Sequence, residues 1–118
     1  MFEAVFKAIG EPTRLKIIKL LSHRELCVCD LEEAMQMSQP RISQHLKVLK
    51  HAGIVNERKE GQRTICSLNE IALNTTIHEF LQFIDKPIEQ IPEMEEEVAR
   101  LPVVTGDACL KKSCEQAI

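Results

Sequence analysis

The sequence contains no tryptophan and no tyrosine, and it has only four phenylalanines among its 118 residues. Aliphatic side chains must therefore form the core, and a content of 44% hydrophobic and 28% charged residues is typical of a soluble, mostly helical domain. No apolar run approaches the roughly 18 residues that span a bilayer, and residues 1–4 lack the pattern of a secretion signal. We therefore expect a cytoplasmic protein with no membrane partner.

The motifs of common enzymes are also missing. The sequence has no glycine-rich loop of the kind that cradles phosphate, and no Cys, His and Asp are spaced as a nucleophile with its base. We therefore expect a protein that is not an enzyme and that uses no organic cofactor.

The net charge of −3 is unevenly distributed along the chain. Residues 1–66 carry 11 Lys and Arg against 8 Asp and Glu, a net charge of +3, whereas residues 67–118 carry 4 against 10, a net charge of −6. Between residues 37 and 66, 6 basic residues stand against 2 acidic ones. A local basic region in an acidic protein is the pattern expected of a nucleic-acid binder.

Apolar spacing and capping residues predict four helices in the first half of the chain. A short helix over residues 2–9 is followed by a second helix that opens at Pro12. Asp30 and Glu33 match a capping box at the start of a third helix. Ser38 can cap a fourth helix, which carries a regular apolar stripe.

Two short strands and a long helix are predicted next. Residues 54–58 and 63–68 read as a β-hairpin with glycine in its turn, and Asn69 can cap the long helix. The fold class is thus mostly α with a small β-hairpin wing, a winged helix-turn-helix. We expect a DNA-binding and dimerisation domain over residues 1–85, followed over 86–118 by a helical extension and a flexible, cysteine-containing tail.

The fourth helix is the expected DNA-reading element. In a helix-turn-helix, the second helix enters the major groove, where Gln suits adenine and Arg suits guanine. Basic residues of the wing contact phosphates and add salt-dependent affinity. The alternative is that these polar residues are only a solvated face. The candidate DNA-binding residues are Gln39, Arg41, Ser43, Gln44, Lys47, Arg58, Lys59 and Arg63.

Two of the five cysteines, Cys27 and Cys29, lie one residue apart in the run ELCVCDL at 25–31. In a reducing compartment, paired thiols indicate a metal or redox site, and thiolates select soft ions. Side chains two residues apart share a face in an extended segment but not in a helix, so chelation requires an extended start of the third helix. The alternative is packing as small core residues, which we expect for Cys66.

Together these segments resemble the ArsR/SmtB family of metal-sensing repressors. The resemblance rests on ELCVCDL, on GEPTRLKIIKLLS at 10–22 and on SQPRISQHLKVLKHAGIV at 38–55, and it covers about residues 2–84. It implies a homodimer joined through the first and fifth helices, and a pseudo-palindromic double-stranded DNA operator. It also implies a transcriptional repressor that leaves its operator when a metal ion binds.

The family resemblance leaves the ion open, because ELCVCDL occurs in both arsenite sensors and cadmium/lead sensors. Arsenite sensors often have a third cysteine where this chain has Glu32. We expect trivalent arsenic or antimony as the inducer, with cadmium or lead as the alternative. Besides Cys27 and Cys29, the candidate ligands are Cys109 and Cys114. These two are also the expected pair of a thiol-redox regulator, because in an extended segment Cys27 and Cys29 are too near in sequence for an easy disulfide.

Overall fold

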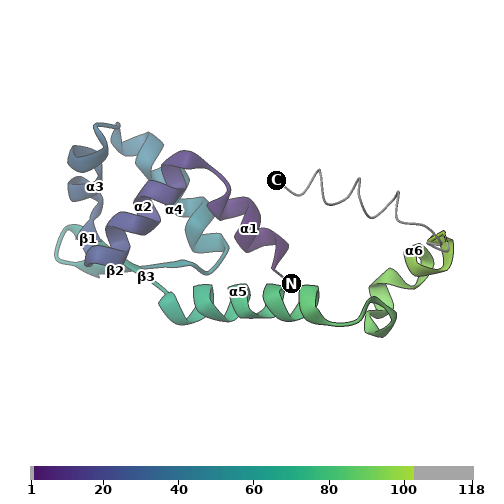
Figure 1. The fold of residues 1–118 in the computed structure, drawn as a ribbon. Helices are drawn as coiled ribbons and strands as arrows, with labels where there is room; N and C mark the ends of the chain where they lie inside the picture. Colours follow the sequence, from purple (N-terminus) through teal and green to yellow (C-terminus); the bar gives the residue numbers. More distant parts are fainter. Residues whose placement is uncertain (1, 103–118) are drawn as a thin grey trace. The chain divides into compact units, whose positions relative to one another are not determined.

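The computed structural model describes residues 2–102 (Figure 1) and divides the chain into two compact units at Phe83. No helix among these residues is long and apolar enough to cross a membrane. The first unit contains α1 (Glu3–Ile9), α2 (Pro12–His23), β1 (Leu26–Cys27), α3 (Val28–Met35), α4 (Gln39–His51), β2 (Val55–Glu60), β3 (Arg63–Leu68) and most of α5 (Glu70–Asp85). The second unit contains η1 (Ile88–Gln90), η2 (Pro92–Met94) and α6 (Glu95–Arg100).

The core of the first unit is aliphatic, as the lack of large aromatics predicts. Ile17 of α2 and Leu31 of α3 are fully buried, and they belong to one cluster with Ile42, Leu46 and Leu49 of α4. Burying each such side chain contributes about 1.5–3 kcal/mol. The predicted apolar stripe of α4 is confirmed, and it holds that helix against α2 and α3.

The sheet has three antiparallel strands in the order β1-β3-β2. The hairpin of β2 and β3 confirms the predicted wing, but β2 extends to Glu60, so the turn shortens to Gly61 and Gln62. Gly61 has a φ of +63°, which glycine adopts without steric cost. Strand β1 was not predicted, and it pairs Cys27 with Ile65 of β3. This pairing fixes the first thiol to the base of the wing.

All four phenylalanines of the sequence gather in one cluster between α1 and α5. The ring centroids of Phe6 and Phe80 lie 4.8 Å apart, and Phe2 contacts Phe80 and Phe83 at 5.5 Å. Edge-to-face pairs of this kind stabilise by about 0.5–1.5 kcal/mol each beyond their burial. The four phenylalanines thus pack the long helix α5 against the N-terminal helix α1.

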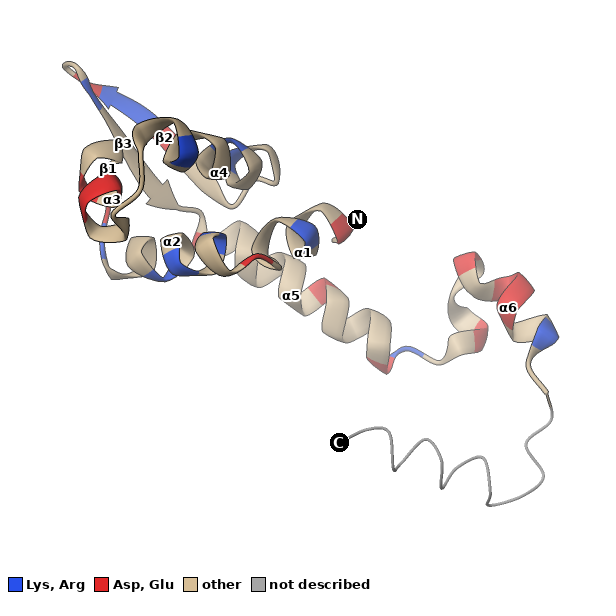
Figure 2. Ribbon diagram, turned by 90° about the horizontal axis from the view of Figure 1, so that it is seen from above, with Lys and Arg blue, Asp and Glu red and all other residues tan. Residues whose placement is uncertain are grey.

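The second unit is short and acidic. Ile91 is its buried residue, and Glu95, Glu96 and Glu97 form the first turn of α6. Figure 2 shows this concentration of acidic residues on α6, whereas basic residues lie on α4 and β2 of the first unit. The predicted charge division lies at residue 66, whereas the two units divide at Phe83, so the acidic residues Glu70 and Glu79 of α5 belong to the first unit.

Candidate metal and DNA-binding site

The first thiol caps helix α3. The backbone of Cys27 is extended (φ −78°, ψ 162°), and its Sγ accepts a hydrogen bond from the Asp30 N–H at 3.2 Å. In return, the Cys27 N–H donates to Asp30 Oδ2 at 3.1 Å. The capping box predicted from Asp30 and Glu33 is therefore wrong by three residues: the helix starts earlier, and Asp30 is the third residue of its first turn.

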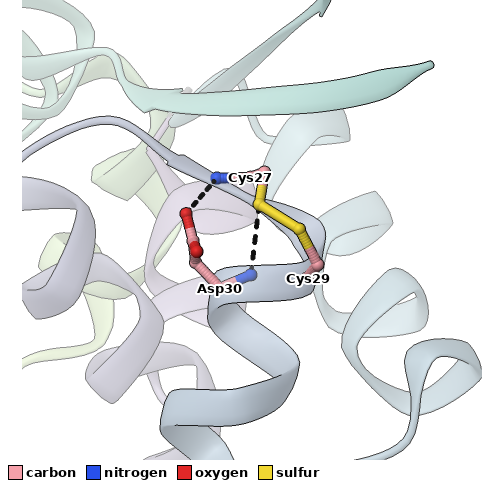
Figure 3. A group of neighbouring side chains, drawn as sticks. All are labelled: Cys27, Cys29 and Asp30. Carbon is pink, nitrogen blue, oxygen red and sulfur yellow. Dashed lines mark hydrogen bonds between the residues drawn. A yellow bond between two sulfur atoms is a disulfide. The ribbon is translucent and has the colours of Figure 1, made fainter.

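The second thiol lies against the first (Figure 3). Cys29 is in the first turn of α3, and the structure joins Cys27 and Cys29 as a disulfide with their Cα atoms 5.3 Å apart. The expectation that the two are too near in sequence for a disulfide is wrong. The chain changes from extended at Cys27 to helical at Cys29, and this junction gives a Cα separation within the usual range of about 4.4–6.8 Å.

A carboxylate completes a three-membered donor group. The ligand atoms of Cys27, Cys29 and Asp30 all lie within 4.8 Å of one another. Cys27 is buried, Asp30 is half-buried and Cys29 is exposed. Sequence reasoning missed Asp30 as a donor, because it was interpreted as a capping residue alone. Two thiolates with one carboxylate can hold a soft or borderline ion that solvent reaches through Cys29.

The thiols open onto α4, the predicted DNA-reading helix. A pocket of about 640 Å³ is lined by Cys27 and Cys29 on one side and by Gln39, Ser43 and Lys47 of α4 on another. An ion or small molecule that reaches the thiols therefore enters the same space that these predicted DNA-binding side chains border.

The predicted DNA-binding residues of α4 are accessible to solvent. Gln39, Arg41, Gln44 and Lys47 are exposed, and Ser43 is half-buried. The Gln39 side-chain amide donates to Ser43 Oγ at 2.8 Å. Lys47 makes no ion pair with any residue from 2 to 102, so its ammonium group is available for a phosphate.

In the wing, Arg58 is engaged by two carboxylates. Its guanidinium donates to Glu25 at 2.8 Å and to Glu60 at 2.8 Å. These bonds raise the pKa of Arg58, and the bond from Arg58 lowers the pKa of the Glu25 carboxyl. Glu25 directly precedes β1, so this ion pair links β2 to the thiol segment.

The other two wing bases are also near the hairpin and the thiols. Lys59 Nζ donates to Thr64 Oγ1 at 3.0 Å. Arg63 lines the same pocket as the thiols, and its guanidinium lies 4.0 Å from Asp30 Oδ2. Of the three basic residues in the wing, Arg63 is thus the one that contacts the candidate donor group.

The remaining cysteines separate into a core residue and two tail residues. Cys66 is 0% exposed, which confirms the expectation of simple packing, and burial raises the pKa of its thiol to about 11. Cys109 and Cys114 lie outside the described residues.

Comparisons with known proteins agree with this architecture. Residues 11–57 match the family described as bacterial regulatory protein, arsR family. The chain is 42% identical over 82 residues to the transcriptional repressor SdpR of Bacillus subtilis, covering 70% of this chain and 91% of that protein. It is 40% identical over 87 residues to the arsenical resistance operon repressor of Staphylococcus xylosus, covering 74% and 76%. A cadmium resistance regulator, the CadC homolog of Staphylococcus aureus, is 45% identical over 67 residues, covering 56% and 55%.

Two solved structures share the fold. A crystal structure of a possible transcriptional regulator for arsenical resistance has a TM-score of 0.60 and 32% identity, covering 82% of this chain and 95% of that one. The solution structure of a homodimeric winged helix-turn-helix DNA-binding domain from Mycobacterium bovis has a TM-score of 0.58 and 29% identity, covering 69% and 74%.

Proposed function

Because the chain belongs to the ArsR family of transcriptional repressors, we propose that it leaves its operator when trivalent arsenic or antimony binds the thiolates of Cys27 and Cys29. The observation that carries this proposal is the convergence of both sulfurs beside the DNA-reading helix, in one pocket with Gln39, Ser43 and Lys47. An arsenical resistance repressor among the similar proteins supports the choice of ion.

The DNA-binding part of the proposal rests on α4 and the wing. Gln39, Arg41, Ser43, Gln44 and Lys47 read base edges and phosphates from α4, because their side chains lie off the buried stripe of that helix. From the wing, Arg58, Lys59 and Arg63 add contacts to phosphates. Arg58 must exchange a carboxylate for a phosphate to do so.

The proposed operator is pseudo-palindromic, because the proposed repressor is a homodimer. Within residues 2–102, helix α5 has no buried residue, and its side chains Ile77 and Leu81 are 37% and 52% exposed. The phenylalanine cluster packs the neighbouring side of α5 against α1. A second copy that covers Ile77 and Leu81 would place two α4 helices for two half-sites.

Release follows from the double role of Cys27. Its Sγ caps α3, and a thiolate that binds an ion turns its lone pairs toward that ion. An ion held by both sulfurs therefore draws Cys27 Sγ away from the Asp30 N–H and weakens the cap bond. Loss of a cap costs about 0.5–2 kcal/mol, which is comparable to the typical allosteric coupling of about 1–3 kcal/mol. Because α3 packs on α4, the DNA-reading helix loses its support.

The test is release of labelled operator DNA, followed by fluorescence anisotropy during titration with arsenite. The variant Cys27→Ser with Cys29→Ser removes both soft donors, while serine is itself a favoured N-cap residue. It should bind the operator like the natural chain and ignore arsenite. The matched variant Cys109→Ser with Cys114→Ser tests the tail cysteines, the other candidate ligands. Release by arsenite that survives loss of Cys27 and Cys29 would refute the proposed site.

A cadmium- or lead-responsive repressor is the second candidate, favoured by one observation. Among the described residues, the Asp30 carboxylate lies within 4.8 Å of both sulfurs as a third donor. Carboxylate oxygen suits a borderline divalent ion better than it suits arsenic. Titration with cadmium and lead decides between the two. Release by cadmium that Asp30→Asn weakens, with no response to arsenite, would establish the second candidate.

A further inference from the structure

We propose that Cys27 and Cys29 are also a redox modification site, at which a low-molecular-weight disulfide oxidises the pair and thereby makes the operator-bound repressor insensitive to its inducer. The inference rests on the proposed function, because it concerns the same two thiols. It adds oxidation as a second signal. Oxidation keeps the repressor on its operator, whereas the ion releases it.

The reason is that the disulfide preserves the cap bonds between Cys27 and Asp30, which the bound ion would weaken. With the two sulfurs bonded, Cys27 Sγ still accepts the Asp30 N–H at 3.2 Å, and the Cys27 N–H still donates to Asp30 at 3.1 Å. Cys27 also keeps its pairing with Ile65 of β3. In α4, which packs on α3, Leu46 is buried at 1% exposure. Oxidation therefore leaves helix α3 capped and α4 supported, which is the state that binds DNA.

The same bond removes the ion's ligands. Thiolates, not disulfide sulfurs, are the soft donors that bind metal ions and arsenicals. Once Cys27 and Cys29 are bonded to each other, Asp30 is the donor that remains of the three-membered group. A single carboxylate cannot hold a soft ion against water. The oxidised protein thus stays on its operator when the inducer is present.

The positions of the two thiols assign their order of reaction. Cys29 is exposed and lines the pocket of about 640 Å³, whereas Cys27 is 1% exposed. The Cys29 thiolate attacks one sulfur of the small disulfide, whose S–S bond breaks and releases one thiolate. The Cys27 thiol then loses its proton to solvent, and its sulfur attacks Cys29 Sγ and expels the second thiolate. The protein pair loses two electrons, and the small disulfide gains them and becomes two thiols.

The experiment uses the full chain with operator DNA, oxidised glutathione as the probe, and a non-thiol phosphine to reduce it. Bonded cysteines are located by alkylation and peptide mass analysis. We expect the Cys27–Cys29 bond, operator affinity unchanged within about twofold, and an increase of about tenfold or more in the arsenite needed for half release. Reduction should restore the original response.

The variant Cys109→Ser with Cys114→Ser is the matched control, because it keeps Cys27 and Cys29 while removing the competing tail pair. It should behave like the natural chain. Oxidation that itself releases the operator would overturn the proposal, as would undiminished release of the oxidised protein by arsenite or a bond found only between the tail cysteines. If the reduced protein responds to no soft ion, the proposed function fails, and the claim of inducer insensitivity fails with it. The same experiment still measures whether the Cys27–Cys29 bond forms and whether the oxidised protein keeps its operator affinity.

Discussion

Helices α4 and α5 are both amphipathic, but the described part of the chain fully buries apolar side chains of α4 and none of α5. In α4, Ile42, Leu46 and Leu49 are at most 1% exposed. In α5 no residue is buried, and Ile77 and Leu81 project from the surface of the described chain. This difference fits the two proposed roles. The helix proposed to read DNA is packed against its own chain, and the long helix proposed to bind a second copy keeps exposed apolar side chains.

The largest expected effect separates the two apolar faces directly. Leu46→Ala should lower the free energy of unfolding by about 2–5 kcal/mol, because it leaves a cavity in a packed core. Leu81→Ala should change it by less than about 0.5 kcal/mol at protein concentrations low enough to favour the monomer. Urea titration followed by circular dichroism measures both. Equal losses at low concentration would mean that α5 is buried within the monomer.

A charge on α5 tests what covers that helix. Leu81→Asp would bury a carboxylate in the proposed dimer interface, so the dimer dissociation constant should rise on the order of 100-fold. Gln82→Glu is the control: it adds the same charge one position along, about 100° around the helix. Sedimentation equilibrium measures the constant. If both variants dimerise like the natural chain, the exposed stripe of α5 has another role.

The sequence predicts α4 and α5 well because both follow a helical period over three or more turns. Strand β1 escapes prediction because Leu26 and Cys27 alone have no period, and their pairing depends on β3, which lies about 40 residues later. The start of α3 is misplaced for a different reason. The pairs Cys27/Asp30 and Asp30/Glu33 both have the three-residue spacing of a capping box. Cysteine is not among the residues preferred at an N-cap, so the sequence favours Asp30 as the cap over Cys27.

The candidate site was predictable in its residues but not in its geometry. ELCVCDL identifies Cys27 and Cys29 as the thiols, because two soft donors stand close in sequence. Their contact depends on a change from extended to helical backbone between them, which no residue type in the run specifies. The same junction brings in the Asp30 carboxylate and, across β3, the Arg63 guanidinium. Arg63 comes near through tertiary pairing and had no signal in the sequence, whereas Asp30 stands in the run itself and was interpreted only as a capping residue.

A smaller effect tests whether α4, and not α5, meets the DNA backbone. Lys47→Gln removes an exposed charge from each of the two α4 helices of the proposed dimer, so the slope of log affinity against log salt should become shallower by about 1.8, that is, about 0.9 for each lost phosphate contact. Lys86→Gln, directly after α5, should leave the slope unchanged. Anisotropy titrations over a range of salt concentrations provide both slopes. Equal changes would show a general charge effect in place of a contact.

The smallest effect compares how the two helices begin. Asn69 caps α5, since its Oδ1 accepts the Ala72 N–H at 3.1 Å, whereas Ser38 precedes α4 without a side-chain cap bond, contrary to what its residue type predicts. Asn69→Ala should therefore lower the free energy of unfolding by about 1 kcal/mol. Ser38→Ala should lower it by no more than about 0.5 kcal/mol. The buried side chains Ile42, Leu46 and Leu49 hold α4 in place without a cap. Helix α5 has no buried side chain among the described residues, so its stability depends more on the cap of its first turn. Denaturant titrations at one low protein concentration compare the two variants, and a larger loss for Ser38→Ala would reverse this assignment.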